Sequence, residues 1–262
     1  MRLLLAVIAS IAAAVAHGQE IVTLQARAGV TQSYLLVGTP QQAQAVAVLF
    51  PGGAGNIRLR LESEQVRFSP GNFLVRSRTE FVSRGVAAAV VDTPSDQQPG
   101  MADEFRLGEQ HYADILAVVQ DLRKRFPGIP VFLAGTSRGT ISAASIGKRM
   151  GKDVDGVVLT ATLFLAGAGR RAQPGLSGFD FGTIPAPLLF VHHRDDACNV
   201  TPYQSARQLA NRFPLVSVSG GLPPQSEPCE AMSNHGFLGK ESETVAAIVN
   251  WMLKKPFPRE IH

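Results

Sequence analysis

The chain has 262 residues, a length that fits one large α/β domain better than two smaller ones. Apolar residues make up 45% of it and charged residues 18%, as in an ordinary globular protein. The formal net charge is only +4 and the basic residues are scattered, so we expect no nucleic-acid partner.

Residues 1–18 have the pattern of a cleaved secretory signal. A basic second residue precedes an apolar run, Leu3–Val15, and Ala14 and Ala16 form an A-x-A cleavage pattern. The run is shorter than a membrane span needs, and no cysteine that would carry a lipid stands at the predicted cut. An N-terminal anchor helix is the alternative interpretation. We expect a secreted or periplasmic protein with no stable membrane anchor and one mature domain, 19–262.

Cysteine usage agrees with export. Cys198 and Cys229 are the two cysteines of the chain, and an even number in an exported protein predicts one disulfide between them. In a cytosolic protein the same pair would more often be buried thiols.

Short apolar runs alternate with amphipathic segments along the mature chain. After an expected antiparallel pair within 20–39, the runs predicted to be buried strands are 45–50, 86–91, 130–135, 156–161, 187–192 and 214–219. The segments with a helical apolar face are 111–126, 138–150, 201–213 and 242–255. This alternation predicts an α/β protein with a mostly parallel, doubly wound sheet and helices on both faces. No internal repeat or linker divides it.

One pentapeptide, Gly135-Thr136-Ser137-Arg138-Gly139, lies between a predicted strand and a predicted helix. The pattern G-x-S-x-G is weak evidence by itself because it arises by chance. Its position strengthens it, since a nucleophilic serine on a sharp strand-to-helix turn leaves no room for side chains two positions away on either side. A glycine-bounded turn in another doubly wound fold is the alternative.

On this motif the chain resembles the α/β-hydrolase family, in which the triad follows the order serine, acid, histidine. The resemblance implies that Ser137 is the nucleophile. Of the six histidines, only His235 and His262 lie far enough along the chain to be the base, and His262 is the frayed last residue. His235 is therefore the expected base, against the alternative of a solvated loop histidine.

The family's acid follows a strand in an H-G-x-x-D pattern, which His192 to Asp196 match except that His193 replaces the glycine. Asp196 is the expected acid and Asp195 the alternative if the register differs by one. The nearby histidines, aspartates and Cys198 do not have the spacing of metal ligands, so we expect no metal.

The resemblance also implies two backbone N–H donors for an oxyanion. One is that of Arg138, and the others come from the glycine-rich loop after the third strand, where we expect Gly53 and Ala54 to donate. Pro51 stands where histidine is common in the family.

These residues imply a serine hydrolase without a cofactor that acts on small-molecule acyl substrates, most simply a carboxylesterase on small soluble esters. A serine peptidase or amidase of the same fold and a non-catalytic binding protein on this scaffold are the alternatives. The segment 162–186 is too short and glycine-rich for a large cap. The insertion 56–78 alternates apolar and basic residues and is either a hairpin over the pocket or a strand on the surface.

Overall fold

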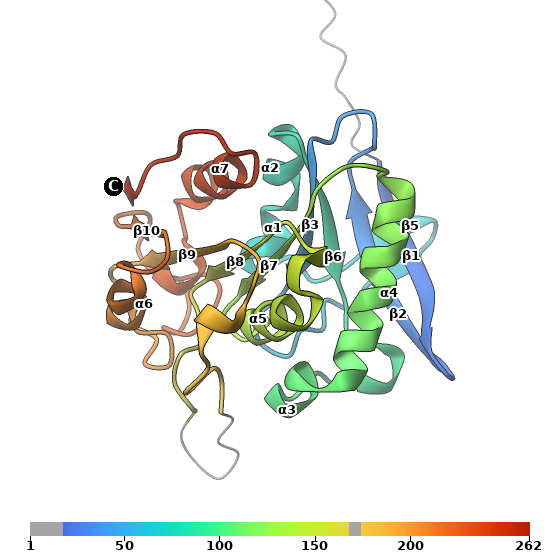
Figure 1. Cartoon of the computed structure of the whole chain (residues 1–262), viewed down its shortest axis with the longest axis horizontal. Coiled ribbons are helices and arrows are strands. Elements are labelled where there is room, and N and C mark those ends of the chain that lie inside the picture. Colours follow the sequence, from blue (N-terminus) through green and yellow to red (C-terminus); the bar gives the residue numbers. More distant parts are fainter. Residues whose placement is uncertain (1–17, 168–173) are drawn as a thin grey trace, which may run out of the picture.

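The computed structural model describes residues 18–167 and 174–262 (Figure 1). The predicted signal segment falls almost entirely within residues 1–17, which lie outside the described residues. Within the described ranges, no helix is both long and apolar enough to cross a membrane.

The centre of the fold is a nine-stranded sheet in the order β1-β2-β6-β3-β7-β8-β9-β10-β11. The antiparallel contacts are those of β2 with β1 and with β6, and the other neighbours run parallel. The strands of this sheet are β1 Gln19–Arg27, β2 Val30–Val37, β3 Ala45–Phe50, β6 Val86–Val91, β7 Val131–Thr136, β8 Gly156–Thr160, β9 Leu188–His193, β10 Leu215–Val218 and β11 Glu260–Ile261. The predicted α/β architecture with its antiparallel N-terminal pair is confirmed.

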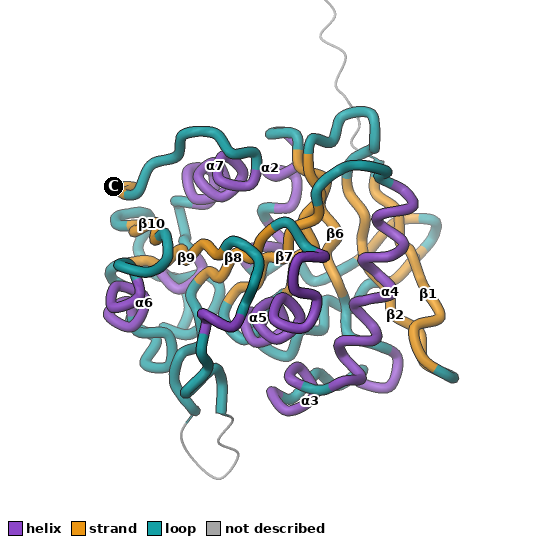
Figure 2. Tube along the Cα trace, viewed as in Figure 1, coloured by secondary structure: helices purple, strands orange, loops and turns teal. Residues whose placement is uncertain are grey.

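Helices cover both faces of the sheet (Figures 1 and 2). They are α1 Phe73–Arg76, α2 Arg78–Ser83, α3 Asp103–Leu107, α4 Glu109–Arg125, α5 Gly139–Met150, α6 Tyr203–Leu209 and α7 Glu241–Met252, with short 3₁₀ turns η1 Ser95–Gln97, η2 Gly151–Asp153, η3 Phe181–Thr183 and η4 Asn234–Gly236. Apolar side chains of α4, α5 and α6 pack in one core, and those of α1, α2 and α7 pack in the other. Because the sheet has a buried layer on each face, β3, β6, β7 and β9 are buried along their whole length.

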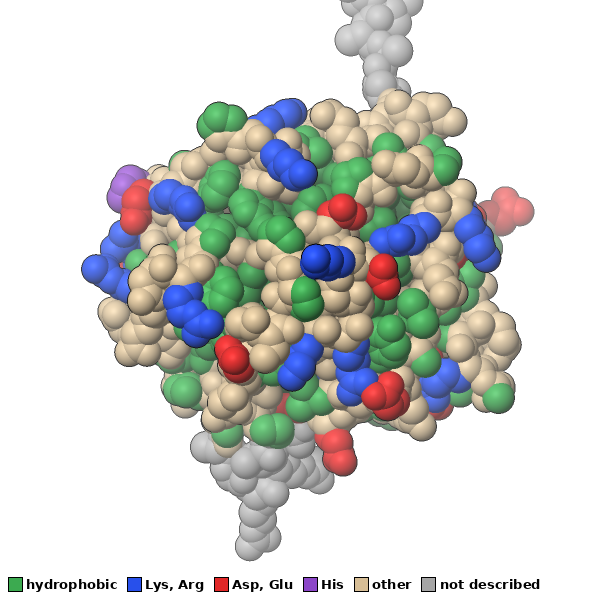
Figure 3. Space-filling view, in the orientation of Figure 1, with side chains coloured by type: hydrophobic (Ala, Val, Ile, Leu, Met, Phe, Trp, Pro, Cys, Tyr) green, Lys and Arg blue, Asp and Glu red, His purple; other side chains and the backbone are tan. Residues whose placement is uncertain are grey.

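The insertion after β3 forms a separate antiparallel hairpin of β4 Arg60–Glu62 and β5 Gln65–Arg67. Its strands are exposed apart from the half-buried Val66, so the hairpin lies on the surface. The segment between β8 and β9 contains only the 3₁₀ turn η3 within its described residues. On the face drawn in Figure 3, basic and acidic side chains are interspersed over the surface.

Candidate active site

Ser137 lies on a strained turn between β7 and α5. Its φ is +52°, in the left-handed region that residues with a Cβ avoid. A Cβ on Gly135 would overlap the carbonyl oxygen of Gly139, and a Cβ on Gly139 would overlap that of Phe50. Glycine at both positions therefore permits the turn, and Ser137 lines a cavity at its apex.

The loop after β3 passes directly beside this serine. A Cβ on Gly52 would lie 3.0 Å from the Cβ of Ser137. Gly53, at φ +58°, also lines the cavity. Ala54 does not line it, and its carbonyl oxygen accepts a hydrogen bond from Met101 N–H. Of the two expected donors in this loop, Gly53 lines the cavity with Ser137 and Ala54 does not.

A buried arginine holds the loop after β3 by a hydrogen bond. Arg106 is 1% exposed, and its guanidinium donates to the carbonyl oxygen of Gly53 at 3.1 Å and to Ser142 Oγ at 3.0 Å. The Ser142 hydroxyl in turn lies 2.9 Å from Nε2 of His111. Burial lowers the pKa of Arg106 to about 9. The contact fixes the orientation of the peptide that follows Gly53.

Arg138, the residue after Ser137, points its side chain away to α3. Its Nε donates to Asp103 Oδ1 at 2.9 Å, and Asp103 Oδ2 accepts from Gly175 N–H at 3.0 Å. The Asp103 carboxylate is fully buried. Within the described residues, neither Arg138 N–H nor Gly53 N–H donates a backbone hydrogen bond outside helices and strands. Gly53 lines the cavity beside Ser137, whereas Arg138 follows Ser137 without lining it.

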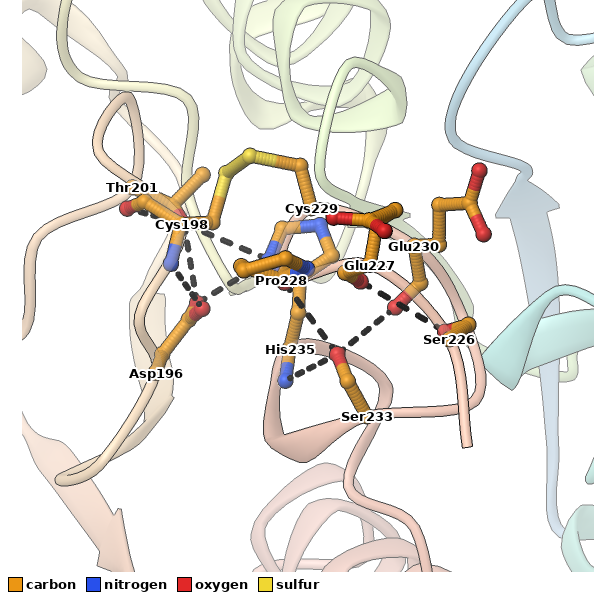
Figure 4. Close-up of a disulfide and its surroundings, with 10 residues drawn as sticks. All are labelled: Asp196, Cys198, Thr201, Ser226, Glu227, Pro228, Cys229, Glu230, Ser233 and His235. Carbon is orange, nitrogen blue, oxygen red and sulfur yellow. Dashed lines mark hydrogen bonds and ion pairs between the residues drawn. A yellow bond between two sulfur atoms is a disulfide. The ribbon is translucent and has the colours of Figure 1, made fainter. Parts of the chain in front are cut away.

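An acid and a base meet across two loops (Figure 4). His235 Nδ1 lies 3.0 Å from Asp196 Oδ2, and both side chains are buried. Asp196 also accepts from Cys198 N–H at 2.9 Å and from the Thr201 hydroxyl at 2.8 Å. Because the carboxylate accepts at Nδ1, the hydrogen of neutral His235 is on Nδ1 and Nε2 carries the lone pair. Nε2 has no hydrogen-bond partner in the described part of the chain, and His235 lines the same cavity as Ser137.

The neighbouring acid occupies a different environment. Asp195 is exposed, and its contacts use the backbone: its N–H donates to His193 Nδ1 and its carbonyl oxygen accepts from Asn234. His193, which replaces the glycine of the acid motif, also bonds to the carbonyl of Gly220 through Nε2 at 3.0 Å. The His193 ring thus bonds to both Asp195 and Gly220, and Asp196 is the carboxylate that contacts His235.

The two cysteines form the predicted disulfide, with a Cα–Cα distance of 4.6 Å (Figure 4). Cys198 donates its N–H to Asp196, and Cys229 lines the cavity in the loop that precedes His235. The bridge thus joins the loop of the acid to the loop of the base.

Removal of this bridge is expected to lower both stability and activity. Closing a loop of 31 residues contributes roughly 3 to 4 kcal/mol on the chain-entropy estimate. Cys198→Ser/Cys229→Ser should therefore lower Tm by about 6 to 16 °C. The variant should also lower kcat at a temperature where it is fully folded, because the His235 loop loses its tether. Thermal unfolding and kinetics with and without reductant measure both, and an unchanged kcat in the folded variant would show that the bridge does not position His235.

Two fully buried histidines, His192 and His111, lie behind the site. His192 Nε2 accepts from Thr162 N–H at 2.8 Å. Burial lowers the pKa of both imidazoles to about 3, and for His111 the charges of Arg106 and Arg27 add to the effect. Both rings are therefore neutral in the folded protein at neutral pH.

These histidines predict a loss of stability in acid. Between pH 6.5 and 3, the unfolded chain binds protons that the folded chain does not, so the free energy of unfolding falls as the pH falls. Each histidine contributes up to about 1.4 kcal/mol per pH unit in that window. Denaturant unfolding at several pH values should show this slope, and His111→Gln should reduce it. An equal slope in the variant would contradict a depressed pKa at His111.

The cavity that contains Ser137 and His235 has a volume of about 430 Å³. Both apolar and polar side chains line it, and they come from the loop after β3, the start of α1 and the His235 loop. The lining side chains other than Ser137 and His235 include Asn56, Ile57, Ser69, Asn72, Phe73, Ser226, Glu230 and Met232. Within residues 18–167 and 174–262, no group of three or more His, Cys, Asp and Glu side chains is arranged to hold a metal.

Three residues at the site were not predicted from the sequence. Thr201 bonds to Asp196, Arg106 holds Gly53, and Asn72 lines the cavity. None of them belongs to a motif with a fixed spacing from Ser137. The one sequence signal for Thr201 is its position in the loop after β9, five residues beyond Asp196.

Comparison with known proteins agrees with this arrangement. The family model of serine aminopeptidases, S33, matches residues 93–219, a range that includes Ser137 and Asp196. No curated protein sequence gives a significant match.

Several solved structures share the fold at low sequence identity. Est1E from Butyrivibrio proteoclasticus is 14% identical with a TM-score of 0.60, over 90% of this chain and 98% of that one. An α/β serine hydrolase homologue from Coxiella burnetii is 12% identical with a TM-score of 0.56, over 90% and 96% of the two chains. An α/β serine hydrolase without a lid from Xanthomonas campestris is 14% identical with a TM-score of 0.54, over 87% and 94%. Together with the sheet order, these matches show that the chain has the α/β-hydrolase fold.

Proposed function

We propose that the protein is a serine carboxylesterase that hydrolyses small soluble esters through an acyl-enzyme on Ser137. The observation that carries the proposal is the buried His235–Asp196 hydrogen bond, which leaves Nε2 of His235 unpartnered at a cavity that Ser137 also lines. A base oriented in this way can take a proton from a neighbouring hydroxyl.

In the proposed reaction, Ser137 Oγ attacks the ester carbonyl carbon while its proton passes to Nε2 of His235. The π electrons of the carbonyl move to its oxygen, which the N–H groups of Arg138 and Gly53 stabilise. The tetrahedral intermediate collapses, the bond to the leaving alkoxide breaks, and His235 returns the proton to that alkoxide. Water then repeats the sequence on the acyl-enzyme and releases the acid. Asp196 stays ionised and stabilises the imidazolium.

The cavity supports substrates of modest size. Its volume of about 430 Å³ lies in the lower part of the usual range for small-molecule sites, roughly 300 to 1,000 Å³. Ile57, Phe73 and Met232 provide apolar surface for an acyl group. We expect p-nitrophenyl acetate and butyrate to be hydrolysed faster than the laurate ester, since a long chain would extend beyond the cavity.

An amidase or peptidase activity is the second candidate, and the serine aminopeptidase family model favours it. The same triad chemistry serves both reactions, but an amine leaves less readily than an alkoxide and needs its proton from His235 earlier. Parallel assays with p-nitrophenyl esters and aminoacyl p-nitroanilides on the mature protein decide between them. Turnover of the anilides at rates near those of the esters would favour the peptidase, and no turnover of either substrate would contradict both.

A further inference from the structure

Asn72 presents an oriented amide to the cavity. It precedes α1, and its side-chain Oδ1 accepts a hydrogen bond from Leu74 N–H at 3.2 Å, as an N-cap residue does. Because the carbonyl end of the amide is committed to this bond, Nδ2 must point to the other side. Within the described residues, Nδ2 donates no hydrogen bond, and Asn72 lines the cavity.

Gly52 shows how close this amide lies to the nucleophile. A Cβ on Gly52 would lie 3.2 Å from Asn72 Nδ2 and 3.0 Å from Ser137 Cβ. The amide nitrogen and the serine therefore border the same small space. Glycine leaves this space open, next to the N–H of Gly53 in the oxyanion loop.

The segment that carries Asn72 is held against the loop of His235. The rings of Phe73 and Phe237 have centroids 4.8 Å apart. Arg76 donates to the carbonyl oxygens of both Gly71 and Gly236, and so joins the residue before Asn72 to the residue after His235. The amide is thereby fixed relative to the base, which an electrostatic role in the transition state requires.

We propose that Asn72 is a third oxyanion donor, in addition to the backbone N–H groups of Arg138 and Gly53. The role rests on the proposed esterase function. When Ser137 Oγ bonds to the carbonyl carbon and the π electrons move to the oxygen, Nδ2–H donates a hydrogen bond to that oxygen. No proton is transferred, and the bond weakens again when the carbonyl re-forms. Loss of one such donor typically lowers kcat by about 10²- to 10³-fold.

Asn72→Ser tests the donor separately from the helix cap. Serine retains an oxygen that can accept from Leu74 N–H but has no amide to reach the oxyanion. We expect kcat for p-nitrophenyl butyrate to fall by about 10²-fold, with KM nearly constant and Tm unchanged. Asn72→Asp, which keeps the shape and the cap but replaces the donor with a carboxylate oxygen, should lose at least as much. Asn72→Ala should lose a similar factor in kcat and also show a lower Tm, because its cap is missing.

A thionoester distinguishes a donor to the oxyanion from a structural role. Sulfur accepts hydrogen bonds weakly, so the wild-type protein should prefer the oxygen ester strongly and Asn72→Ser should prefer it much less. A wild-type kcat in Asn72→Ser, or an equal loss for both esters, would overturn the role of Asn72 while the esterase function stands. A wild-type protein inactive on all esters would overturn the function itself, and this role with it.

Discussion

Ser137→Ala is expected to lower kcat/KM for ester hydrolysis by about 10⁴-fold or more, with little change in the folded structure. The substitution removes only the hydroxyl at the apex of the turn. Alanine and serine both carry a Cβ, so the strain of a φ of +52° is the same in the two proteins. Steady-state kinetics with p-nitrophenyl butyrate, together with circular dichroism, measure both parts of the expectation.

Ser145→Ala is the matched control for this variant. Ser145 lies on α5, is 6% exposed and makes one weak contact of 3.5 Å with the carbonyl of Leu107. It does not line the cavity. Its loss should leave kcat within about twofold of wild type, as for residues remote from a site. Turnover near the wild-type rate in folded Ser137→Ala would contradict Ser137 as the nucleophile.

Asp196→Asn is expected to lower kcat by about 10⁴-fold. The carboxylate accepts hydrogen bonds from Cys198 N–H and Thr201 Oγ1 as well as from His235. Cys198 N–H bonds to Oδ1, whereas Thr201 and His235 contact Oδ2. An asparagine that keeps its single oxygen toward Cys198 N–H turns its amide nitrogen toward Nδ1, which places the imidazole hydrogen on Nε2. His235 then cannot accept the proton of Ser137.

Asp195→Asn provides the comparison, since it removes the same charge one residue away. The Asp195 side chain is exposed, and neutralising it should change kcat by less than about threefold, as a surface charge does. Kinetics of the two variants at one pH decide the register of the acid. A large loss of kcat in Asp195→Asn with a small loss in Asp196→Asn would show that Asp195, and not Asp196, is the acid.

The strands of the sheet could be predicted closely because their apolar runs have sharp ends. The predicted strands at 45–50 and 86–91 coincide with β3 and β6. The prediction missed β11, whose two residues, Glu260 and Ile261, have no apolar periodicity. It is a strand because it pairs with the edge of β10, a tertiary contact that no local pattern encodes.

The residues proposed for the triad could be found because their motifs lie at strand ends. Parallel strands place their carboxyl ends at one edge of the sheet, so the turn of Ser137 after β7 and the loop of Asp196 after β9 lie near each other. The contributions of Arg106 and Asn72 depend on the path of α3 and of the insertion across this edge. A single sequence contains no periodicity that reports such packing.

The glycine-rich loop after β3 shows the same limit at the level of single residues. Three glycines close to β3 led to the prediction of oxyanion donors in this loop, but its conformation decides which of its residues line the cavity with Ser137. The positive φ of Gly53 and of Gly55 turns the chain so that Ala54 contacts the segment of Met101. Glycine permits many backbone conformations, and the sequence alone does not select among them.

The most direct test is to trap the acyl-enzyme or its analogue on the proposed nucleophile. The mature protein is incubated with a fluorophosphonate, and intact-mass and peptide mass spectrometry then count and locate the adduct. We predict a single adduct on Ser137, formed more slowly in Asp196→Asn and absent in Ser137→Ala. An unmodified protein, or an adduct on another serine of the cavity such as Ser69 or Ser226, would contradict Ser137 as the nucleophile.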